Sequence, residues 1–396
     1  MKTGHSPLAR LEALSRKKRP VIAGLMSGTS MDGLDIAFCH VDGQAGGKRR
    51  MEMLAAHTAP MPDRFRPRIE QAMEGDLVEA ARLDIELGRW YAEATLDLAR
   101  KHGIAVDLVG SHGQTVCHEH GRTTLQIGEP GFLANRLDCV VAHDFRRGDV
   151  VAGGCGAPLV PIFDRLVMGL DDAAVLSVNI GGIANLTIVP PLHRSNEEPL
   201  AFDCGPGNMV IDRIVERRTN GTTLFDEGGA EAARGRVNEK LLAELMTHPF
   251  VTAEAPKSAG REQFGREFTD ALVERASPQS DSDWQDLLAT VTAWTAECII
   301  AAARGKRIER AFIAGGGAHN TTLMARLRHG LAGVEFTHPD ETGIDPDFKE
   351  ALAFALLAQL LIEGEPANVP RATGAAGPAL LGRLTFPDGS SSLDRG

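Results

Sequence analysis

The residues with the clearest chemical potential form a turn between two apolar stretches, within MSGTSMDGLD at residues 26–35. This turn combines small residues, hydroxyls and carboxylates. Because no bulky side chain keeps the backbone away, its N–H groups could approach phosphate oxygens closely. Glycine, serine and aspartate also dominate ordinary turns, so a plain β-hairpin fits the same residues. The spacing alone leaves both interpretations open.

A second turn of this kind occurs later in the chain. Gly181 and Gly182 separate the apolar stretches 173–180 and 183–189. Each stretch is rich in β-branched residues, which favour strands. The pattern therefore predicts a second β-hairpin with a Gly-rich tip.

A third Gly-rich turn, Gly315 to Gly317, follows the strand-like stretch 310–314 and precedes a predicted helix at 321–328. Asn320 lies between the glycines and this helix. A Gly-rich turn that leads into a helix N-terminus is a favourable place for a nucleotide. Two hairpins followed by this third turn fit a nucleotide held between two related lobes.

Further helices and strands are predicted between these turns. Asp76 and Glu79 resemble a capping box at the start of an amphipathic helix, and this helix ends at Gly103. A strand at 104–109 then leads into a predicted loop at 111–115, which contains His112 and Gln114. Ligands collect at such strand ends in open α/β sheets. We also predict a strand at 140–142, and long helices at 284–302 and 345–361. The Gly-rich stretch 152–158 fits a hinge between domains or a plain loop.

Composition excludes several classes of function. The 396 residues carry 42 Lys and Arg against 53 Asp and Glu, a net charge of −11, which argues against nucleic-acid or membrane-surface partners. We identify no membrane-spanning stretch and no signal peptide. The six cysteines are scattered, as expected of reduced thiols. The P-loop, dinucleotide-binding and nucleophile-elbow motifs are also absent.

A series of motifs runs in order from about residue 21 to Leu381. The motifs are MSGTSMDGLD (26–35), SHGQTVCHE (111–119), LQIGEP (125–130), DFRRGDV (144–150), GGCGAPLVP (153–161), NIGGIANLT (179–187), FDCGPGN (202–208) and AGGGAHN (314–320). Together they resemble the anhydro-N-acetylmuramic acid kinase family of the sugar kinase, actin and heat-shock ATPase superfamily. Cys155 stands where the family pattern has glutamine, and Cys117 where a bulkier residue is usual.

The resemblance implies an α/β, two-lobed actin-like ATPase (ribonuclease H-like) fold with the active site in the interdomain cleft. We expect residues 1–20 to form an N-terminal tail. The first lobe is expected at 21–152, completed by 364–396, and the second at 153–363. The first lobe would carry one phosphate-binding hairpin. The second would carry the other hairpin and an adenosine loop.

The resemblance also implies the reaction. The γ-phosphoryl group of ATP would pass to 1,6-anhydro-N-acetylmuramic acid while its anhydro ring is opened by water, which gives N-acetylmuramic acid 6-phosphate. We expect an ATP- and Mg²⁺-dependent, cytoplasmic homodimer of cell-wall recycling. A kinase for another amino sugar is the first alternative. A sugar-sensing module that binds without turnover is the second, because fold does not fix function.

Residues of the three turns are the expected nucleotide ligands. Asp32 and Asp35 are the nearest carboxylates for Mg²⁺, held through water, but the metal ligands stay unassigned. The expected ligands of ATP are Gly28, Thr29, Ser30, Met31, Asp32, Gly33, Leu34, Asp35, Gly181, Gly182, Gly315, Gly316, Gly317 and Asn320.

Asp203 is the expected catalytic base, since the resemblance assigns that role to the aspartate of FDCGPGN. It opens a Gly/Pro turn after a predicted strand, where it could also act only as a cap. Glu350 lies in a largely apolar helix, and it either binds a sugar hydroxyl or is a surface residue of the first turn. We also expect His112 and Gln114 to bind sugar hydroxyls. Arg146 or Arg147 would lie near the lactyl carboxylate of the sugar.

Overall fold

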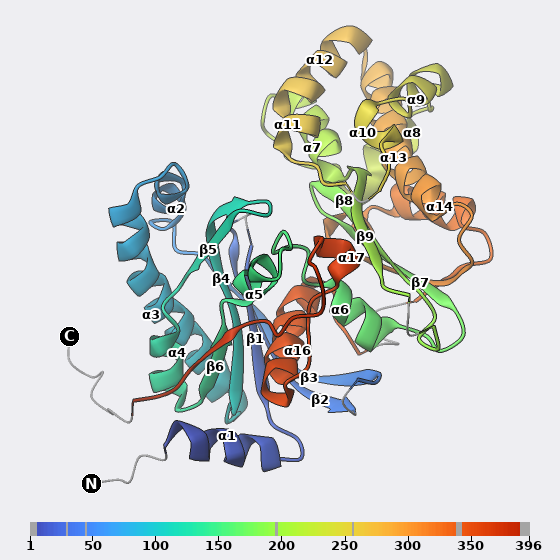
Figure 1. The fold of residues 1–396 in the computed structure, drawn as a ribbon. Helices are drawn as coiled ribbons and strands as arrows, with labels where there is room; N and C mark the ends of the chain where they lie inside the picture. Colours follow the sequence, from blue (N-terminus) through green and yellow to red (C-terminus); the bar gives the residue numbers. More distant parts are fainter. Residues whose placement is uncertain are drawn as a thin grey trace. The chain divides into compact units, whose positions relative to one another are not determined.

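The chain forms two compact units in a computed structural model. Unit 1 comprises Met1–Val167 and Gly343–Gly396, and unit 2 comprises Met168–Thr342. Each unit contains its own β-sheet with helices packed against it (Figure 1). The structure describes residues 6–28, 31–43, 46–194, 197–255, 257–337 and 343–388.

The sheet of unit 1 has seven strands in the order β12-β6-β4-β1-β2-β3, with β5 paired to β4. β1, β2 and β3 are antiparallel, whereas β4 is parallel to β1 and β6 is parallel to β4. The predicted first hairpin is thus confirmed as β1 and β2. The strands are β1 (Ile22–Ser27), β2 (Gly33–Gly43), β3 (Arg49–Pro60), β4 (Leu108–Glu119), β5 (Thr123–Ile127), β6 (Val140–His143) and β12 (Arg383–Thr385).

The predicted loop at 111–115 is wrong, because these residues belong to β4. Ser111 and Gln114 pair with β1, and β5 pairs with the second half of β4 from Gln114 to Glu119. Gly113 has a φ of 76°, a value that glycine adopts without strain. The strand therefore continues through the residues that the sequence pattern assigned to a loop.

Helices of unit 1 begin and end at recognisable signals. The backbone N–H of Glu79 donates to Asp76 at the start of α3, and Gly103 ends α3 in a left-handed conformation. Part of the predicted N-terminal tail is helical, and its Arg10 forms an ion pair with Asp138. The helical segments are α1 (Pro7–Arg16), α2 (Arg66–Met73), α3 (Leu77–His102), α4 (Pro130–Leu137), α5 (Phe145–Val151), α6 (Pro161–Phe163), a π-helical turn (Asp164–Met168), a 3₁₀ turn (Pro346–Phe348), α16 (Lys349–Glu363) and α17 (Pro370–Thr373).

Helix α16 packs on the sheet of unit 1, so the unit boundaries differ from those expected. Residues 153–167 and 343–363 belong to unit 1 and not to the second lobe. A Cβ atom on Gly24 would overlap the carbonyl oxygen of Ala351, and one on Gly110 would overlap that of Phe354. The backbone of α16 thus lies directly on β1 and β4. Its almost continuous apolar surface is buried there.

The sheet of unit 2 has the order β11-β10-β7-β8-β9. β7, β8 and β9 are antiparallel, whereas β10 is parallel to β7 and β11 is parallel to β10. The second predicted hairpin and the strand at 310–314 are both confirmed. The strands are β7 (Ala174–Ile180), β8 (Ile183–Val189), β9 (Leu200–Pro206), β10 (Ile308–Ala314) and β11 (Glu335–Phe336).

Helix α13 is the central helix of unit 2. It is long and apolar enough to cross a membrane by length and composition, contrary to the sequence analysis, but 72% of its most apolar window is buried in the protein. Burial in a core accounts for that composition. The helical segments are α7 (Asn208–Arg218), a 3₁₀ turn (Glu227–Gly229), α8 (Ala230–Arg234), α9 (Glu239–Leu245), α10 (Pro249–Thr252), α11 (Arg261–Phe264), α12 (Arg266–Ala276), α13 (Asp281–Ala303), a 3₁₀ turn (Gly316–His319) and α14 (Thr321–Gly330).

The same five-strand arrangement occurs in both units. Strands β3-β2-β1-β4-β6 of unit 1 correspond to β9-β8-β7-β10-β11 of unit 2, with three antiparallel strands followed by two parallel ones. This repeat confirms the predicted α/β, two-lobed actin-like ATPase (ribonuclease H-like) fold. All six cysteines are free thiols, as the sequence predicted.

We predict that Gly110→Ala strongly destabilises the protein, because the new methyl group would overlap the backbone of α16. Overpacking of this kind costs at least about 1–3 kcal/mol of unfolding free energy. Gly377→Ala is the matched control in unit 1, since no atom lies within 4 Å of its added Cβ. Thermal denaturation measures both variants. Equal melting temperatures would contradict direct packing of α16 on the sheet.

Candidate active site

The first Gly-rich turn joins β1 to β2 in unit 1. Thr29 and Ser30, two of the predicted nucleotide ligands, lie outside the described residues. The N–H of Met31 donates to the carbonyl oxygen of Gly28 at 3.2 Å, and Met31 has a φ of 54°. A Cβ on Gly33 would lie 2.7 Å from the carbonyl oxygen of Ala59, so a side chain does not fit there. The described part of this turn therefore closes through the backbone of Gly28 and Met31, and its role in phosphate binding stays a prediction.

Side chains at the end of this turn differ in what they can reach. Leu34 is buried in the core, so only its backbone can serve a ligand. Asp35 is half-buried and accepts a hydrogen bond from the Thr58 hydroxyl at 2.6 Å. Burial raises the pKa of Asp35, and the charges of Asp32 and Asp347 add to this shift. The turn thus gathers carboxylates that repel one another.

The buried side chain of Gln114 supports the turn, and its binding of a sugar hydroxyl stays a prediction. Its side chain has no exposed surface. Its oxygen accepts a hydrogen bond from the Ser27 hydroxyl at 2.6 Å, and its amide nitrogen donates to the carbonyl oxygen of Gly28 at 3.3 Å. A buried amide with these partners fixes the backbone where β1 ends.

His112 is neutral and bonded to Arg146. The Nε of Arg146 donates to Nε2 of His112 at 2.9 Å, while the imidazole packs on the Phe354 ring at a centroid distance of 4.7 Å. Burial, with a smaller contribution from the Arg146 charge, lowers the pKa of His112 well below its usual value. His112 is 5% exposed and accepts its hydrogen bond from Arg146, so its binding of a sugar hydroxyl stays a prediction.

Glu350 lies in the first turn of α16. Its side chain is exposed, which agrees with the surface-residue alternative, yet desolvation by surrounding protein raises the pKa of its carboxyl group. The charges of Arg146 and Lys349 oppose that shift. Lys349 itself forms a buried ion pair with Asp164 at 2.6 Å. Glu350 is therefore an accessible carboxyl group in an environment that disfavours its charge, which is common in functional sites.

In unit 2 the second Gly-rich turn is joined to the start of α7. The carbonyl oxygen of Gly181 accepts from the N–H of Asn208 at 2.7 Å, and that of Gly182 accepts from Gly207 at 2.9 Å. A Cβ on Gly207 would overlap the Gly181 carbonyl oxygen. At Gly181 itself the nearest atom to an added Cβ is 3.8 Å away, so this tip faces open space.

The third Gly-rich turn lies against the same place. A Cβ on Gly315 would lie 2.5 Å from Oδ1 of Asn179 at the end of β7. A Cβ on Gly317 would overlap Ile180 and lie 3.2 Å from Oδ1 of Asn208. Unit 2 therefore brings together both of its predicted Gly-rich turns and the N-terminus of α7.

Asn320 caps helix α14. Its Oδ1 accepts from the N–H of Leu323 at 2.9 Å, and the residue is 7% exposed. The backbone of Gly229 passes so close that a Cβ there would overlap Oδ1 of Asn320. Asn320 thus positions the start of α14, and it offers little surface to a nucleotide. The sequence analysis did not identify the neighbouring Gly228 and Gly229.

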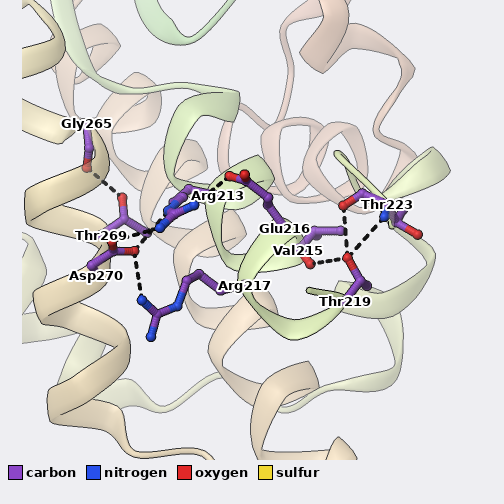
Figure 2. Close-up of polar contacts among 9 residues, drawn as sticks. All are labelled: Arg213, Val215, Glu216, Arg217, Thr219, Thr223, Gly265, Thr269 and Asp270. Carbon is purple, nitrogen blue, oxygen red and sulfur yellow. Dashed lines mark hydrogen bonds and ion pairs between the residues drawn. The ribbon is translucent and has the colours of Figure 1, made fainter. Parts of the chain in front are cut away.

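Helix α7 is held in place by its charged residues (Figure 2). Arg213 donates to both carboxylate oxygens of Asp270 on α12, at 2.9 and 2.8 Å, and forms an ion pair with Glu216 at 2.7 Å. Arg217 approaches Asp270 at 3.5 Å. One turn after Asn208, burial raises the pKa of Asp212 to about 7, with a contribution from Asp226. Asp212 is a carboxyl group that the sequence pattern did not single out.

Asp203 lies on β9 and is held by the loop that precedes α11. Its Oδ2 accepts from the N–H of Ala259 at 2.7 Å and from the Ser258 hydroxyl at 3.0 Å. Its own N–H donates to the carbonyl oxygen of Lys257 at 3.0 Å. The side chain is half-buried. The structure thus fixes the orientation of this carboxylate, and it does not act as a helix cap.

Lys257 anchors the loop that holds Asp203. Its ammonium donates to the carbonyl oxygens of Phe250 and Val251, both at 2.7 Å, and lies 5.0 Å from the centre of the Phe250 ring. These carbonyls belong to the end of α10, where a cation is favoured. Residues 257–259 were not identified from sequence, because no local pattern relates them to Asp203.

Known proteins of similar structure are distant. The activator of 2-hydroxyisocaproyl-CoA dehydratase from Clostridium difficile with bound ADPNP is 12% identical, with a TM-score of 0.41, over 87% of this chain and 96% of that one. A ROK family glucokinase from Streptomyces griseus in complex with glucose and AMPPNP is 12% identical, with a TM-score of 0.36, over 86% and 99% of the two chains.

Sequence relatives are much closer. The anhydro-N-acetylmuramic acid kinase of Caldanaerobacter subterraneus subsp. tengcongensis is 39% identical over 397 residues, which covers 95% of this chain and 100% of that protein. The enzyme of the same name from Bacillus cereus (strain G9842) is 38% identical over 386 residues, covering 92% and 99%. The family model for anhydro-N-acetylmuramic acid kinase matches residues 20–387. The chain therefore belongs to the anhydro-N-acetylmuramic acid kinase family.

Proposed function

We propose that the protein transfers the γ-phosphoryl group of ATP to 1,6-anhydro-N-acetylmuramic acid and opens the anhydro ring in the same reaction. The products are N-acetylmuramic acid 6-phosphate and ADP. Family membership over residues 20–387 supports the kinase activity and a role in cell-wall recycling. The observation that supports the ring-opening step is the fixed orientation of Asp203. A carboxylate held by hydrogen bonds from Ser258 and Ala259 is suited to act as a general base.

The chemistry of the substrate explains why a base is needed. Oxygen 6 of the anhydro sugar is bonded to the anomeric carbon and carries no proton. A water molecule attacks that carbon, and the bond from the carbon to oxygen 6 breaks. The released oxygen 6 attacks the γ-phosphorus, and ADP leaves with the electrons of the broken phosphoanhydride bond. Asp203 accepts a proton from the attacking water.

The Gly-rich turns are proposed to bind the phosphates of ATP through backbone N–H groups. The turn between β1 and β2 in unit 1 and the turn at Gly181 and Gly182 in unit 2 supply small residues for this purpose, and an added Cβ at Gly181 would have no atom nearer than 3.8 Å. Gly315 to Gly317 would contact the nucleoside. Phosphoryl transfer depends on such positioning together with stabilisation of charge.

Mg²⁺ is the proposed metal cofactor, and the carboxylates of unit 1 fit it. The charges of Asp32 and Asp347 disfavour the ionised form of Asp35, so a cation near Asp35 would be favoured. Within the described residues no three His, Cys, Asp or Glu side chains are placed to hold an ion directly. Coordination by Asp32 and Asp35 through water, as Mg²⁺ prefers, is consistent with that. When bound, the ion would neutralise charge on the transferred phosphoryl group.

Sugar binding is assigned to the accessible carboxyl of Glu350, which would bond sugar hydroxyls. His112 acts through Arg146 in this proposal. We further propose that the protein is a cytoplasmic homodimer. The six free thiols are compatible with a reducing compartment.

We predict that Gly181→Val weakens ATP binding without unfolding the protein. The added side chain would occupy the space into which the second turn opens, and its nearest contact is 3.8 Å away. Calorimetric titration with ATP, alongside thermal denaturation, measures both effects. An unchanged affinity for ATP would remove this turn from the phosphate site.

We predict that Asp203→Asn lowers the catalytic rate by about a hundredfold to ten-thousandfold, as is typical when a general base is lost. The amide keeps the shape of the side chain, so binding of sugar and ATP should largely persist. The rate of ADP release with 1,6-anhydro-N-acetylmuramic acid is the measurement. Ser258→Ala is the companion variant, and it should cause a smaller loss because Ala259 still orients the carboxylate. Near-normal turnover of Asp203→Asn would contradict the assignment.

A further inference from the structure

Arg146 differs in its partners from Arg49 and Arg213, two other arginines with little exposed surface. Arg49, whose side chain is 1% exposed, forms ion pairs with Glu363 and Glu365, and Arg213 bonds Asp270 and Glu216. Arg146 instead donates to two neutral acceptors. Its Nε bonds His112 at 2.9 Å, and its Nη1 bonds the carbonyl oxygen of Gly156 at 2.9 Å.

The guanidinium of Arg146 is therefore held firmly while its charge lacks a bonded carboxylate among the described residues. Its second terminal nitrogen, Nη2, makes no hydrogen bond to them. A half-buried cation without an anionic partner is costly. Burial lowers the pKa of Arg146 to about 10, and the charge of Glu350 only partly offsets this shift. An anion from outside the chain would compensate the charge and use the free nitrogen.

Asp149 fixes the backbone that orients Arg146. This aspartate has no exposed surface, and its Oδ2 accepts the N–H of Gly156 at 2.7 Å. The Oδ1 atom accepts from Asn368 Nδ2 at 2.9 Å and from the Thr373 hydroxyl at 2.7 Å. The carboxylate thus holds Gly156 in place relative to the C-terminal segment of unit 1.

The loop containing Gly156 allows this close approach because it is rich in glycine. A Cβ on Gly154 would overlap the Asp149 carboxylate, and Gly156 has a φ of 76°, which favours glycine. The stretch 152–158 was predicted as a hinge or a plain loop. The structure makes it a loop of unit 1 whose carbonyl at Gly156 faces Arg146.

We infer that Arg146 is the receptor for an anionic group of a substrate, and that Asp149 is its positioning residue, acting through Gly156. This inference rests on the proposed function for the identity of the substrates. They offer two sources of the same chemistry, which are the lactyl carboxylate of the sugar and the γ-phosphoryl group of ATP. A planar guanidinium binds either oxyanion well.

The test uses Asp149→Asn, Arg146→Ala and the matched control Asp84→Asn. Asp84 also accepts a glycine N–H in unit 1, from Gly128 at 2.7 Å, but does not bond Arg146 or Gly156. In Asp149→Asn one carboxylate oxygen becomes an NH₂ group, which cannot accept a hydrogen bond. The side chain therefore loses either the bond from Gly156 or the bonds from Asn368 and Thr373. Thermal denaturation identifies folded variants. Steady-state kinetics are measured with ATP and either 1,6-anhydro-N-acetylmuramic acid or 1,6-anhydro-N-acetylglucosamine, which lacks the lactyl group.

We expect Asp149→Asn and Arg146→Ala to lose about 10- to 150-fold in kcat/KM, the range for hydrogen bonds to charged groups. If the carboxylate is the ligand, KM for the lactyl sugar rises and the sugar without that group is unaffected. If the phosphoryl group is the ligand, kcat falls with both sugars. Guanidinium ion added to the solution should partly restore Arg146→Ala and should not restore Asp149→Asn.

A binding measurement separates this inference from the proposed function. The Nε–H resonance of Arg146 in the intact protein, followed by NMR, should shift on addition of D-lactate or inorganic phosphate. It should shift in wild type and Asp84→Asn, and much less in Asp149→Asn. Absence of ADP release by wild type with either sugar would overturn the proposed function alone. The inference would be overturned if neither anion shifted the Arg146 resonance of the wild-type protein. It would also be overturned if folded Asp149→Asn had the same kinetics and the same resonance shift as Asp84→Asn.

Discussion

Direct contact between helix α16 and strands β1 and β4 is the constraint on which the site of unit 1 depends. Gly24 and Gly110 allow it, because any side chain there would overlap the helix backbone. The contact fixes where α16 begins, and so where Glu350 projects. It also places Phe354 against the His112 ring. The same packing that buries the apolar helix thus orients the groups around Arg146.

Unit 2 has the same strand order as unit 1, but its sheet positions two Gly-rich turns and the start of α7. Its antiparallel strands bring Gly181 and Gly182 to the start of α7, and the parallel strand β10 delivers Gly315 to the same place. On the edge strand β9, Asp203 is oriented by a loop that Lys257 anchors to α10. In both units, polar side chains with defined partners therefore hold the groups assigned to chemistry, as pre-organised sites require.

Local sequence patterns predicted most helices and strands. The features that were not predicted depend on contacts between residues far apart in the sequence. Both hairpins and the caps of α3 follow from turn and capping residues, which act over a few positions. The bonds of Gln114 with Ser27 and Gly28 were not predicted, because these residues are far away in sequence. The boundary at 363 was misplaced because the apolar surface of α16 does not reveal which sheet covers it. Ser258 was missed for the same reason, since it reaches Asp203 across 55 positions.

The fate of oxygen atoms tests the central claim, which is that water opens the anhydro ring while phosphate passes directly from ATP to oxygen 6. The reaction is run in water enriched in a heavy oxygen isotope, and the first-formed sugar phosphate is analysed by mass spectrometry before ring-opening exchange occurs. The account predicts label at the anomeric hydroxyl and none in the transferred phosphoryl group. Label in the phosphoryl group of the sugar phosphate, or an unlabelled anomeric oxygen, would contradict it.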